Sequence, residues 1–214
     1  GYPDDALLGQ LPLLYEVCER LPLALGGPLL ALIDDLSGCP PEVVRTDFVQ
    51  TFDYTRRCAP YLTYFAYGDT RRRGVALVTF KAAYRRAGVE FEAPELPDHL
   101  AVVLEFGALH DLTVAVGLML EHRAGLEVLR LALLERGSRW ASVLVAVCTT
   151  LPPLDGDEAA AVARLIEEGP PEEAVGLPYA MDPRLNLQPA LDLPWTSALT
   201  KPLTQSLTEE GVRS

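Results

Sequence analysis

The chain has 214 residues, 49% of them hydrophobic, with a mean hydropathy of +0.15, which is enough for one well-packed domain and too little for two large ones. Its net charge of −12 argues against a general nucleic-acid binder or a protein that binds anionic membranes, because both classes need an excess of Lys and Arg. No uncharged apolar run reaches the roughly 18 to 20 residues that cross a bilayer, and no lysine-led signal segment opens the chain, so we expect a soluble, cytoplasmic protein without a membrane span.

Helical periodicity runs through every long apolar segment, and the sequence has neither sustained period-2 alternation nor an Asn-Gly hairpin signal. These features predict an all-α fold, a single-domain helical bundle over residues 1–168. Beyond Gly169 the chain is rich in proline, threonine and serine and has no apolar period. Residues 169–214 are therefore predicted to form an extended or partly disordered tail.

An aromatic helix is predicted to end at Gly68. Its apolar face carries residues at i, i+4, i+7, i+8 and i+11, namely Tyr54, Cys58, Tyr61, Leu62 and Phe65. Pro60 lies inside this pattern. It either kinks the helix or marks where the regular part begins, because proline removes a backbone donor.

Two helices are predicted to follow. The first begins after Asp69, which stands where an N-cap is needed, and stops at Gly88. The second covers residues 100–109 and is expected to open on Pro97 and Asp98, because proline fits the first turn and a carboxylate complements the unsatisfied amides.

The last part of the domain is predicted to hold three helical segments. A stripe of leucines and smaller apolar residues runs over residues 112–133 and is closed by Gly137. Ser138 is expected to cap a second segment over residues 140–151. A short last helix fits residues 157–168.

Positive charge is concentrated in residues 54–88, here called the basic band. Eight Lys and Arg residues against the single acid Asp69 give this band a charge of +7 and leave −19 for the remainder of the chain. Arg71–Arg73 open a predicted helix, where the helix dipole opposes each cation by a few tenths to about 1 kcal/mol. A solvated first turn is one explanation. Compensation by a carboxylate of a partner, or by Glu92 and Glu95 of this chain, is the other.

The aromatic helix also offers residues for recognition. Its periodicity places Tyr61 and Phe65 on the core face, where packing is their simplest role, and points Tyr64 and Tyr67 away from the core. Tyrosines on the less apolar side of a helix present rigid, amphipathic surface to a peptide at little entropic cost. This arrangement predicts a peptide-binding protein.

Catalytic and metal-binding patterns are absent from the sequence. G-x-S-x-G, the P-loop, G-x-G-x-x-G and H-E-x-x-H do not occur. The neighbours Asp98 and His99 form either half of a catalytic dyad or a helix cap followed by an interfacial imidazole. The four cysteines lack a C-x-x-C pair and the three histidines lack paired spacing, so we expect reduced thiols and neither a metal ion nor a cofactor.

Four sequence blocks occur in a fixed order. They are Phe52-Asp53, Gly68-Asp69-Thr70-Arg71-Arg72-Arg73-Gly74, Glu95-Leu96-Pro97-Asp98-His99-Leu100 and Leu104-Glu105-Phe106. In order and spacing they resemble the NarJ type of redox-enzyme maturation chaperones, relatives of the TorD and DmsD proteins, over about residues 48–107, with a looser helical likeness to about residue 168. The opening Gly1-Tyr2-Pro3-Asp4 resembles the stretch that follows a first helix in this family, so a leading helix is expected to be missing.

The resemblance implies a system-specific chaperone, not an enzyme, with the TorD-like helical fold. Its client would be the N-terminal segment of the catalytic (alpha) subunit of a respiratory nitrate reductase, held for molybdenum cofactor insertion and complex assembly. Molybdenum cofactor delivery proteins are implied as further partners. Three alternatives remain open: a maturation chaperone for a different molybdoenzyme, a small hydrolase or nucleotide-responsive protein using Asp98 and His99, and a helical subunit that stays in a complex permanently.

The resemblance also implies roles for single residues. Glu95, Asp98 and His99 correspond to an E-x-x-D-H signature that is associated with client recognition and nucleotide response. Many TorD and DmsD relatives place proline directly after the glutamate, whereas Leu96 intervenes here. The nitrate reductase branch shares this arrangement, which favours that branch and weakens a carry-over of nucleotide binding.

The predicted peptide-binding residues combine the aromatic helix, the arginine run and the Pro-Asp-His turn, and they are Tyr61, Tyr64, Tyr67, Arg71, Arg72, Glu95, Pro97, Asp98 and His99. An amphipathic client segment would lay its apolar side in a groove between the aromatic helix and this turn. His99 is expected at the edge of the groove, where its usual pKa near 6.5 makes affinity sensitive to mild acid.

Overall fold

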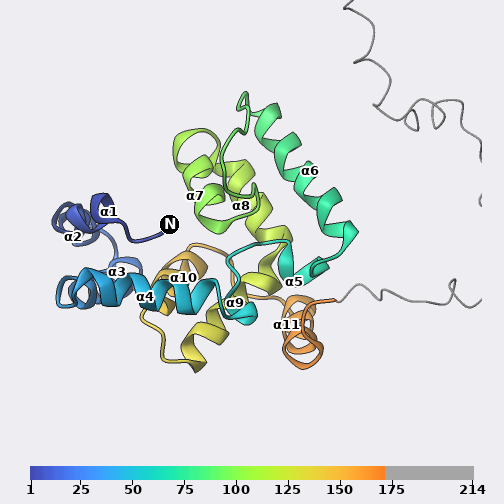
Figure 1. The fold of residues 1–214 in the computed structure, drawn as a ribbon. Coiled ribbons are helices and arrows are strands. Elements are labelled where there is room, and N and C mark those ends of the chain that lie inside the picture. Colours follow the sequence, from blue (N-terminus) through green and yellow to red (C-terminus); the bar gives the residue numbers. More distant parts are fainter. Residues whose placement is uncertain (172–214) are drawn as a thin grey trace, which may run out of the picture. The chain divides into compact units, whose positions relative to one another are not determined.

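The computed structural model describes residues 1–171 of the chain, which lie in one compact unit. Figure 1 shows the described part as a coloured ribbon. The predicted tail lies outside the described residues from position 172 onward.

The predicted all-α fold is confirmed. Within residues 1–171 the chain forms eleven α-helices and one 3-10 helix, and an isolated antiparallel bridge joins Tyr61 and His99. The helices are α1 (Asp5–Gly9), α2 (Leu11–Cys18), α3 (Leu23–Ser37), α4 (Pro41–Phe52), the 3-10 helix η1 (Arg56–Cys58), α5 (Tyr64–Tyr67), α6 (Arg71–Arg86), α7 (Leu100–Leu109), α8 (Leu112–Glu121), α9 (Arg123–Glu135), α10 (Ala141–Thr149) and α11 (Gly156–Glu168).

The N-terminal helices fold onto one another through local signals. The Asp4 carboxylate caps α1 by accepting the Leu7 N–H at 2.8 Å, the usual role of aspartate before a first turn. α2 packs against α3, and α3 packs against α10. The first turns of α3 lie very close to the end of α2, because a Cβ at Gly26 of α3 would be only 2.4 Å from the Cys18 carbonyl oxygen. A side chain at this position would push the two helices apart.

α9 lies at the centre of the described part, in contact with α10, α11, α5 and η1. Leu126, Leu129 and Leu133 form its buried stripe. The same helix buries Glu127, which accepts hydrogen bonds from Arg130 and lies 3.6 Å from an Arg123 nitrogen. The hydrogen bond from Arg130 lowers the pKa of Glu127, so this carboxylate is buried in its charged form with compensating partners.

The aromatic helix predicted over residues 54–67 does not form. A 3-10 turn follows Tyr54, the backbone is extended around Pro60, and regular helix resumes only in the one-turn α5. Pro60 therefore marks where the regular part begins. Its carbonyl oxygen accepts the Leu100 N–H at 2.8 Å, a bond to a distant segment. Tyr54, predicted for the core face, is 81% exposed.

The stripe predicted over residues 112–133 is two helices. His122 adopts φ −112 and ψ 25 between α8 and α9, which breaks the helix. α8 then packs along α7, whereas α9 packs against α10 and α11. Apolar periodicity does not distinguish one long helix from two consecutive helices whose stripes face different partners.

The predicted N-caps of α6 and α10 are wrong. Thr70 precedes α6 without a capping hydrogen bond, and the Asp69 carboxylate pairs with Arg73 at 3.3 Å instead. α10 begins after Trp140, so Ser138 does not cap it. Both errors arise because a cap depends on the backbone conformation just before the helix, which the sequence pattern does not fix.

Other predicted boundaries are confirmed. α6 ends two residues before Gly88, which adopts φ +80, and α7 covers residues 100–109. α11 starts with a capping box in which the carboxylates of Asp155 and Glu158 each accept the other residue's backbone N–H. Across the described residues, no helix is both long enough and apolar enough to cross a membrane.

Candidate functional site

A cavity of about 330 Å³ lies between the N-terminal helices and the start of α7. Its wall is apolar apart from the His99 imidazole and the backbone of Gly1. The lining residues are Gly1, Leu7, Leu11, Leu14, Cys18, Leu29, Leu32, Ile33, Leu36, Phe48, Phe52, Pro60, His99, Leu100, Ala101, Leu104, Leu129, Trp140, Val143 and Leu144.

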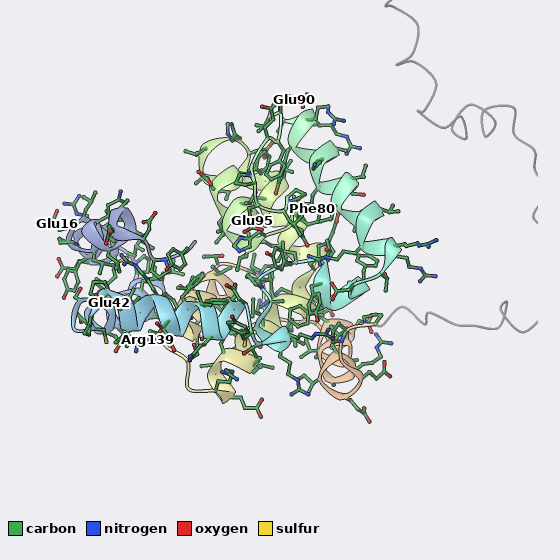
Figure 2. The ribbon with its side chains drawn as sticks, in the orientation of Figure 1. Glu16, Glu42, Phe80, Glu90, Glu95 and Arg139 are labelled. Atoms are coloured by element: carbon green, nitrogen blue, oxygen red, sulfur yellow. The ribbon has the colours of Figure 1, made fainter. Side chains whose placement is uncertain are left out.

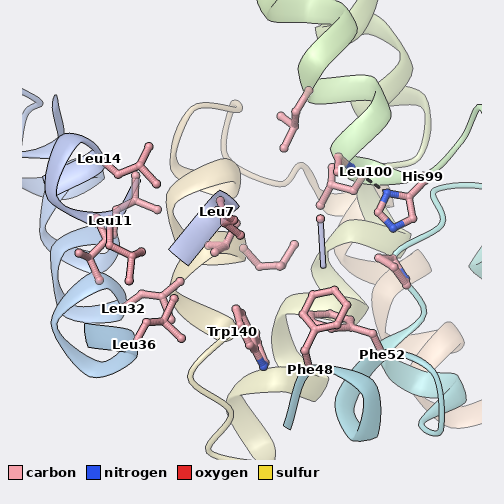
Figure 3. Close-up of a pocket in the computed structure, with 18 of the residues that line it drawn as sticks. Leu7, Leu11, Leu14, Leu32, Leu36, Phe48, Phe52, His99, Leu100 and Trp140 are labelled. Atoms are coloured by element: carbon pink, nitrogen blue, oxygen red, sulfur yellow. Dashed lines mark hydrogen bonds between the residues drawn. The ribbon is translucent and has the colours of Figure 1, made fainter. Parts of the chain in front are cut away.

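Seven helices contribute to this wall, and Figure 3 shows how their side chains meet. Labelled leucines of α2 and α3 form one side of the cavity, and His99 and Leu100 at the start of α7 form the opposite side. Leu7 of α1 lies between them. The cavity is therefore a product of packing between helices that are distant in sequence.

Aromatic rings make a rigid part of the wall. Phe48 packs edge-on against Trp140, with ring centroids 5.3 Å apart, and lies 4.7 Å from Phe52. The Trp140 indole N–H donates to an Asp47 carboxylate oxygen at 2.8 Å, so its polar end is satisfied and its apolar face is left for the cavity. Such a surface suits the apolar side of a ligand.

His99 places an imidazole on the wall. Its Nδ1 caps α7 by accepting the Ala101 N–H at 3.1 Å, the dashed bond at His99 in Figure 3. Burial lowers the pKa of His99, while Glu95 opposes that shift. The cap requires an unprotonated Nδ1. Both effects favour the neutral imidazole at neutral pH.

Tyr61 and Glu95 lie beside this histidine. The Tyr61 hydroxyl donates to a Glu95 carboxylate oxygen at 3.1 Å, and the Tyr61 ring lies 5.2 Å from the His99 ring. Burial, helped by Glu95, raises the pKa of Tyr61 to about 12. The structure thus brings together three of the predicted site residues, although only His99 lines the cavity.

Three predicted site residues are buried in the protein. Tyr64 is 6% exposed and belongs to the core, so the prediction that it points away from the core is wrong. The short α5 begins at Tyr64, and the register inferred from a longer helix does not apply. Asp98 has no exposed surface and Pro97 is equally inaccessible. None of the three lines the cavity.

Asp98 was predicted to cap α7, and this prediction is wrong, because its carboxylate has other partners. It accepts hydrogen bonds from the Thr63 hydroxyl at 2.5 Å and the Thr63 N–H at 3.2 Å. The preceding carbonyl, that of Pro97, accepts the Tyr84 hydroxyl at 2.6 Å. Thr63 and Tyr84 therefore hold the Pro-Asp-His turn by hydrogen bonds, and His99 caps α7.

The remaining predicted residues lie away from the cavity. Tyr67 is half-buried with its ring 6.5 Å from His122. Arg71 and Arg72 are exposed in the first turn of α6, whose buried side is marked by Phe80, facing α7 and α8 in Figure 2. Of the predicted site residues outside the core, only His99 lines the cavity. The groove between the aromatic helix and the turn stays a prediction.

Most residues of the cavity wall were not predicted from the sequence to belong to a site. A usable signal was present, because Leu7, Leu11 and Leu14 recur at helical spacing, as do Leu29, Leu32 and Leu36. Such leucines indicate a core face. Only the tertiary structure distinguishes a core that is filled from one that leaves a cavity.

A second, polar cavity of about 430 Å³ lies where α3 and α4 meet the loop before α10. Arg139 crosses it, with one nitrogen 2.7 Å from an Asp35 carboxylate oxygen and another 3.3 Å from Asp47. Its donors are therefore occupied by this chain's own carboxylates. The arrangement joins three segments of the fold.

The catalytic alternative finds no supporting geometry. The Asp98 carboxylate faces Thr63, whereas Nδ1 of His99 faces the Ala101 N–H, so the two side chains have different partners and do not form a dyad. All four cysteines are free, and the described residues contain no cluster of three or more potential metal ligands.

The fold and this site define an all-α protein whose apolar cavity has one imidazole, that of His99, in its wall. The family is identified by sequence: residues 19–146 match the nitrate reductase delta subunit family, and the chain belongs to it. The resemblance found in the four sequence blocks is therefore confirmed.

Individual relatives agree with this family. The chain is 35% identical over 153 residues to the nitrate reductase-like protein NarX of Mycobacterium tuberculosis, a match that covers 70% of this chain and 22% of that protein. It is 29% identical over 148 residues to the probable nitrate reductase molybdenum cofactor assembly chaperone NarJ of Bacillus subtilis, covering 67% of this chain and 79% of the relative. With the nitrate reductase molybdenum cofactor assembly chaperone NarJ of Escherichia coli the identity is 30% over 143 residues, covering 65% and 61%. The chain thus spans about a fifth of NarX and a larger share of the two NarJ proteins.

Proposed function

We propose that this protein is a chaperone for a respiratory nitrate reductase. It binds the N-terminal segment of the catalytic subunit and holds that subunit for molybdenum cofactor insertion and complex assembly. Membership of the delta subunit family and the names of the NarJ relatives support the chaperone role. The choice of the N-terminal segment as client follows from the family resemblance.

The apolar cavity is the observation that carries the proposal. A cavity of about 330 Å³ with an almost wholly apolar wall exposes surface that a soluble protein normally buries, and such surface marks a binding site. An amphipathic helix would lay its apolar side here, the helix-in-groove mode of recognition. Apolar burial would supply most of the affinity.

Charges around the cavity give the client a preferred chemistry. Exposed carboxylates of Glu95, Asp4 and Glu105 lie near residues of the wall. Burial lowers the pKa of His99, and Glu95 opposes that shift. A client with cationic residues beside its apolar face complements these acids. Such charges affect orientation and the association rate more than the final affinity.

Calorimetric titration with a synthetic peptide of the client's N-terminal segment tests the proposal. We expect reversible one-to-one binding with a negative heat-capacity change, the mark of apolar burial. The control peptide has the same composition, reordered so that its apolar residues no longer share one helix face. Failure of the first peptide to bind, or equal binding of both, would refute the proposal.

Purification of the mature enzyme separates the chaperone from a permanent subunit. A chaperone releases its client once the enzyme is assembled, so the protein is expected to be absent from purified mature nitrate reductase. Copurification in fixed stoichiometry would instead identify a structural subunit.

A further inference from the structure

Two distant segments form the wall of the apolar cavity at the start of α7. The Leu62 N–H donates to the Asp98 carbonyl oxygen at 3.0 Å, and the Leu100 N–H donates to the Pro60 carbonyl oxygen at 2.8 Å. These bonds flank the bridge between Tyr61 and His99. Because Pro60, His99 and Leu100 line the cavity, the register of this pairing fixes where the imidazole stands.

A buried carboxylate closes the pairing from the side away from the cavity. Asp98 has no exposed surface and does not line the cavity. Its Oδ2 accepts both the hydroxyl and the backbone N–H of Thr63, at 2.5 and 3.2 Å. Thr63 comes directly after the paired segment, so one carboxylate ties the end of that segment to the residue before His99.

Arg73 ties the first turn of α6 to the same group. Its Nη2 lies 3.7 Å from Asp98 Oδ2, and its Nε donates to the Thr63 hydroxyl oxygen at 3.3 Å. The guanidinium also lies over the Tyr61 ring, 5.1 Å from the centroid. Asp98 Oδ1 and Arg73 Nη2 have no hydrogen-bond partner within the described part. The attraction between the Arg73 guanidinium and the Asp98 carboxylate therefore adds to the two hydrogen bonds from Thr63 in offsetting the burial of this carboxylate.

We propose that Asp98, Thr63 and Arg73, together called the buried clamp, are positioning residues that set client affinity without touching the client. The clamp holds the Tyr61–His99 bridge in register and so keeps His99 on the cavity wall. Its effect on affinity rests on the proposed function. Its effect on the bridge does not.

Amide hydrogen exchange tests the structural half of the inference. Thr63→Val removes the hydroxyl that joins Asp98 to Arg73 and keeps the shape of the side chain. Since one hydrogen bond contributes about 1 kcal/mol, we expect exchange of the Leu62 and Leu100 amides to accelerate about fivefold, with α9 unchanged. Thr63→Ser, which keeps the hydroxyl, should match the wild type. Unchanged exchange in Thr63→Val would overturn the clamp. Should that variant not fold, Arg73→Lys replaces it.

A double-mutant cycle tests the functional half. Thr63→Val should weaken binding of the client peptide about fivefold in the wild-type background and have little further effect in a His99→Ala background, because the clamp acts through His99. An equal loss of peptide affinity in both backgrounds would show that the clamp does not act through His99. A clamp that served stability alone would leave affinity unchanged well below the melting temperature.

Failure of the proposed function remains distinguishable. If the wild type does not bind the peptide, the client assignment falls, and the cycle is repeated with the dye 1-anilinonaphthalene-8-sulfonate as the cavity ligand. Faster exchange together with weaker dye binding in Thr63→Val would support the clamp. Wild-type dye affinity would refute it.

Discussion

Leu104 offers a direct test of the cavity, because it lines the wall from α7 and is only half-buried in the free protein. Leu104→Ala removes apolar wall that a bound client would cover. Complete burial of a leucine side chain contributes about 1.5 to 3 kcal/mol. Since Leu104 is already partly buried, we expect a loss of about 1 kcal/mol in client binding, or about fivefold in Kd.

The matched control is Leu109→Ala on the same helix. Leu109 is 68% exposed and does not line the cavity. The two variants share their chemistry and their helix but differ in position relative to the cavity. Leu109→Ala should therefore leave client affinity at the wild-type value.

Isothermal titration calorimetry on both variants decides the question, with circular dichroism and urea unfolding as checks on folding. Leu104→Ala should unfold at a somewhat lower urea concentration, with a cost below the roughly 2 to 5 kcal/mol of a fully buried leucine. Equal client affinities for Leu104→Ala and Leu109→Ala would show that the client binds elsewhere.

Three further predictions concern stability. Burial lowers the pKa of His99, so the unfolded chain takes up the proton first and the free energy of unfolding falls as pH drops below about 6.5. In His99→Gln the free energy of unfolding, measured with urea, should depend less on pH. The same pH dependence in this variant as in the wild type would contradict the prediction. Gly68→Ala should lower the melting temperature, because Gly68 has φ +57 and a Cβ there would lie 1.7 Å from the Pro171 carbonyl oxygen. The control is Gly74→Ala, since a Cβ at Gly74 in α6 would meet open space. This control should be neutral or stabilising by up to about 1 kcal/mol. Asp155→Ala removes the α11 cap and should cost about 0.5 to 2 kcal/mol in urea unfolding; no change would mean that α11 adds little to global stability.

Several elements were predictable from the sequence because their signals are local. The positions of α7 and α11, the stop near Gly88 and the turn at Gly137 follow from apolar spacing and glycine. The all-α class follows from the same periodicity, and the four sequence blocks identify the family.

Predictions that depended on distant partners were the ones that were wrong. Tyr64 was assigned to an exposed face by extending one helical register through Pro60, where the backbone is in fact extended and paired with residues before α7. Asp98 was assigned to a helix cap because nothing in its neighbourhood along the chain indicates Thr63 or Arg73 as partners.

The sequence by itself determined the helical class, the family and the positions of α6, α7 and α11, since these depend on interactions within a few turns of the chain. The tertiary structure alone decided which leucines surround an open cavity, and that His99 faces it while Asp98 is turned to the opposite side. The reason is physical. A helix pattern specifies which face is buried, but the space left between seven helices depends on how closely their side chains pack once they meet.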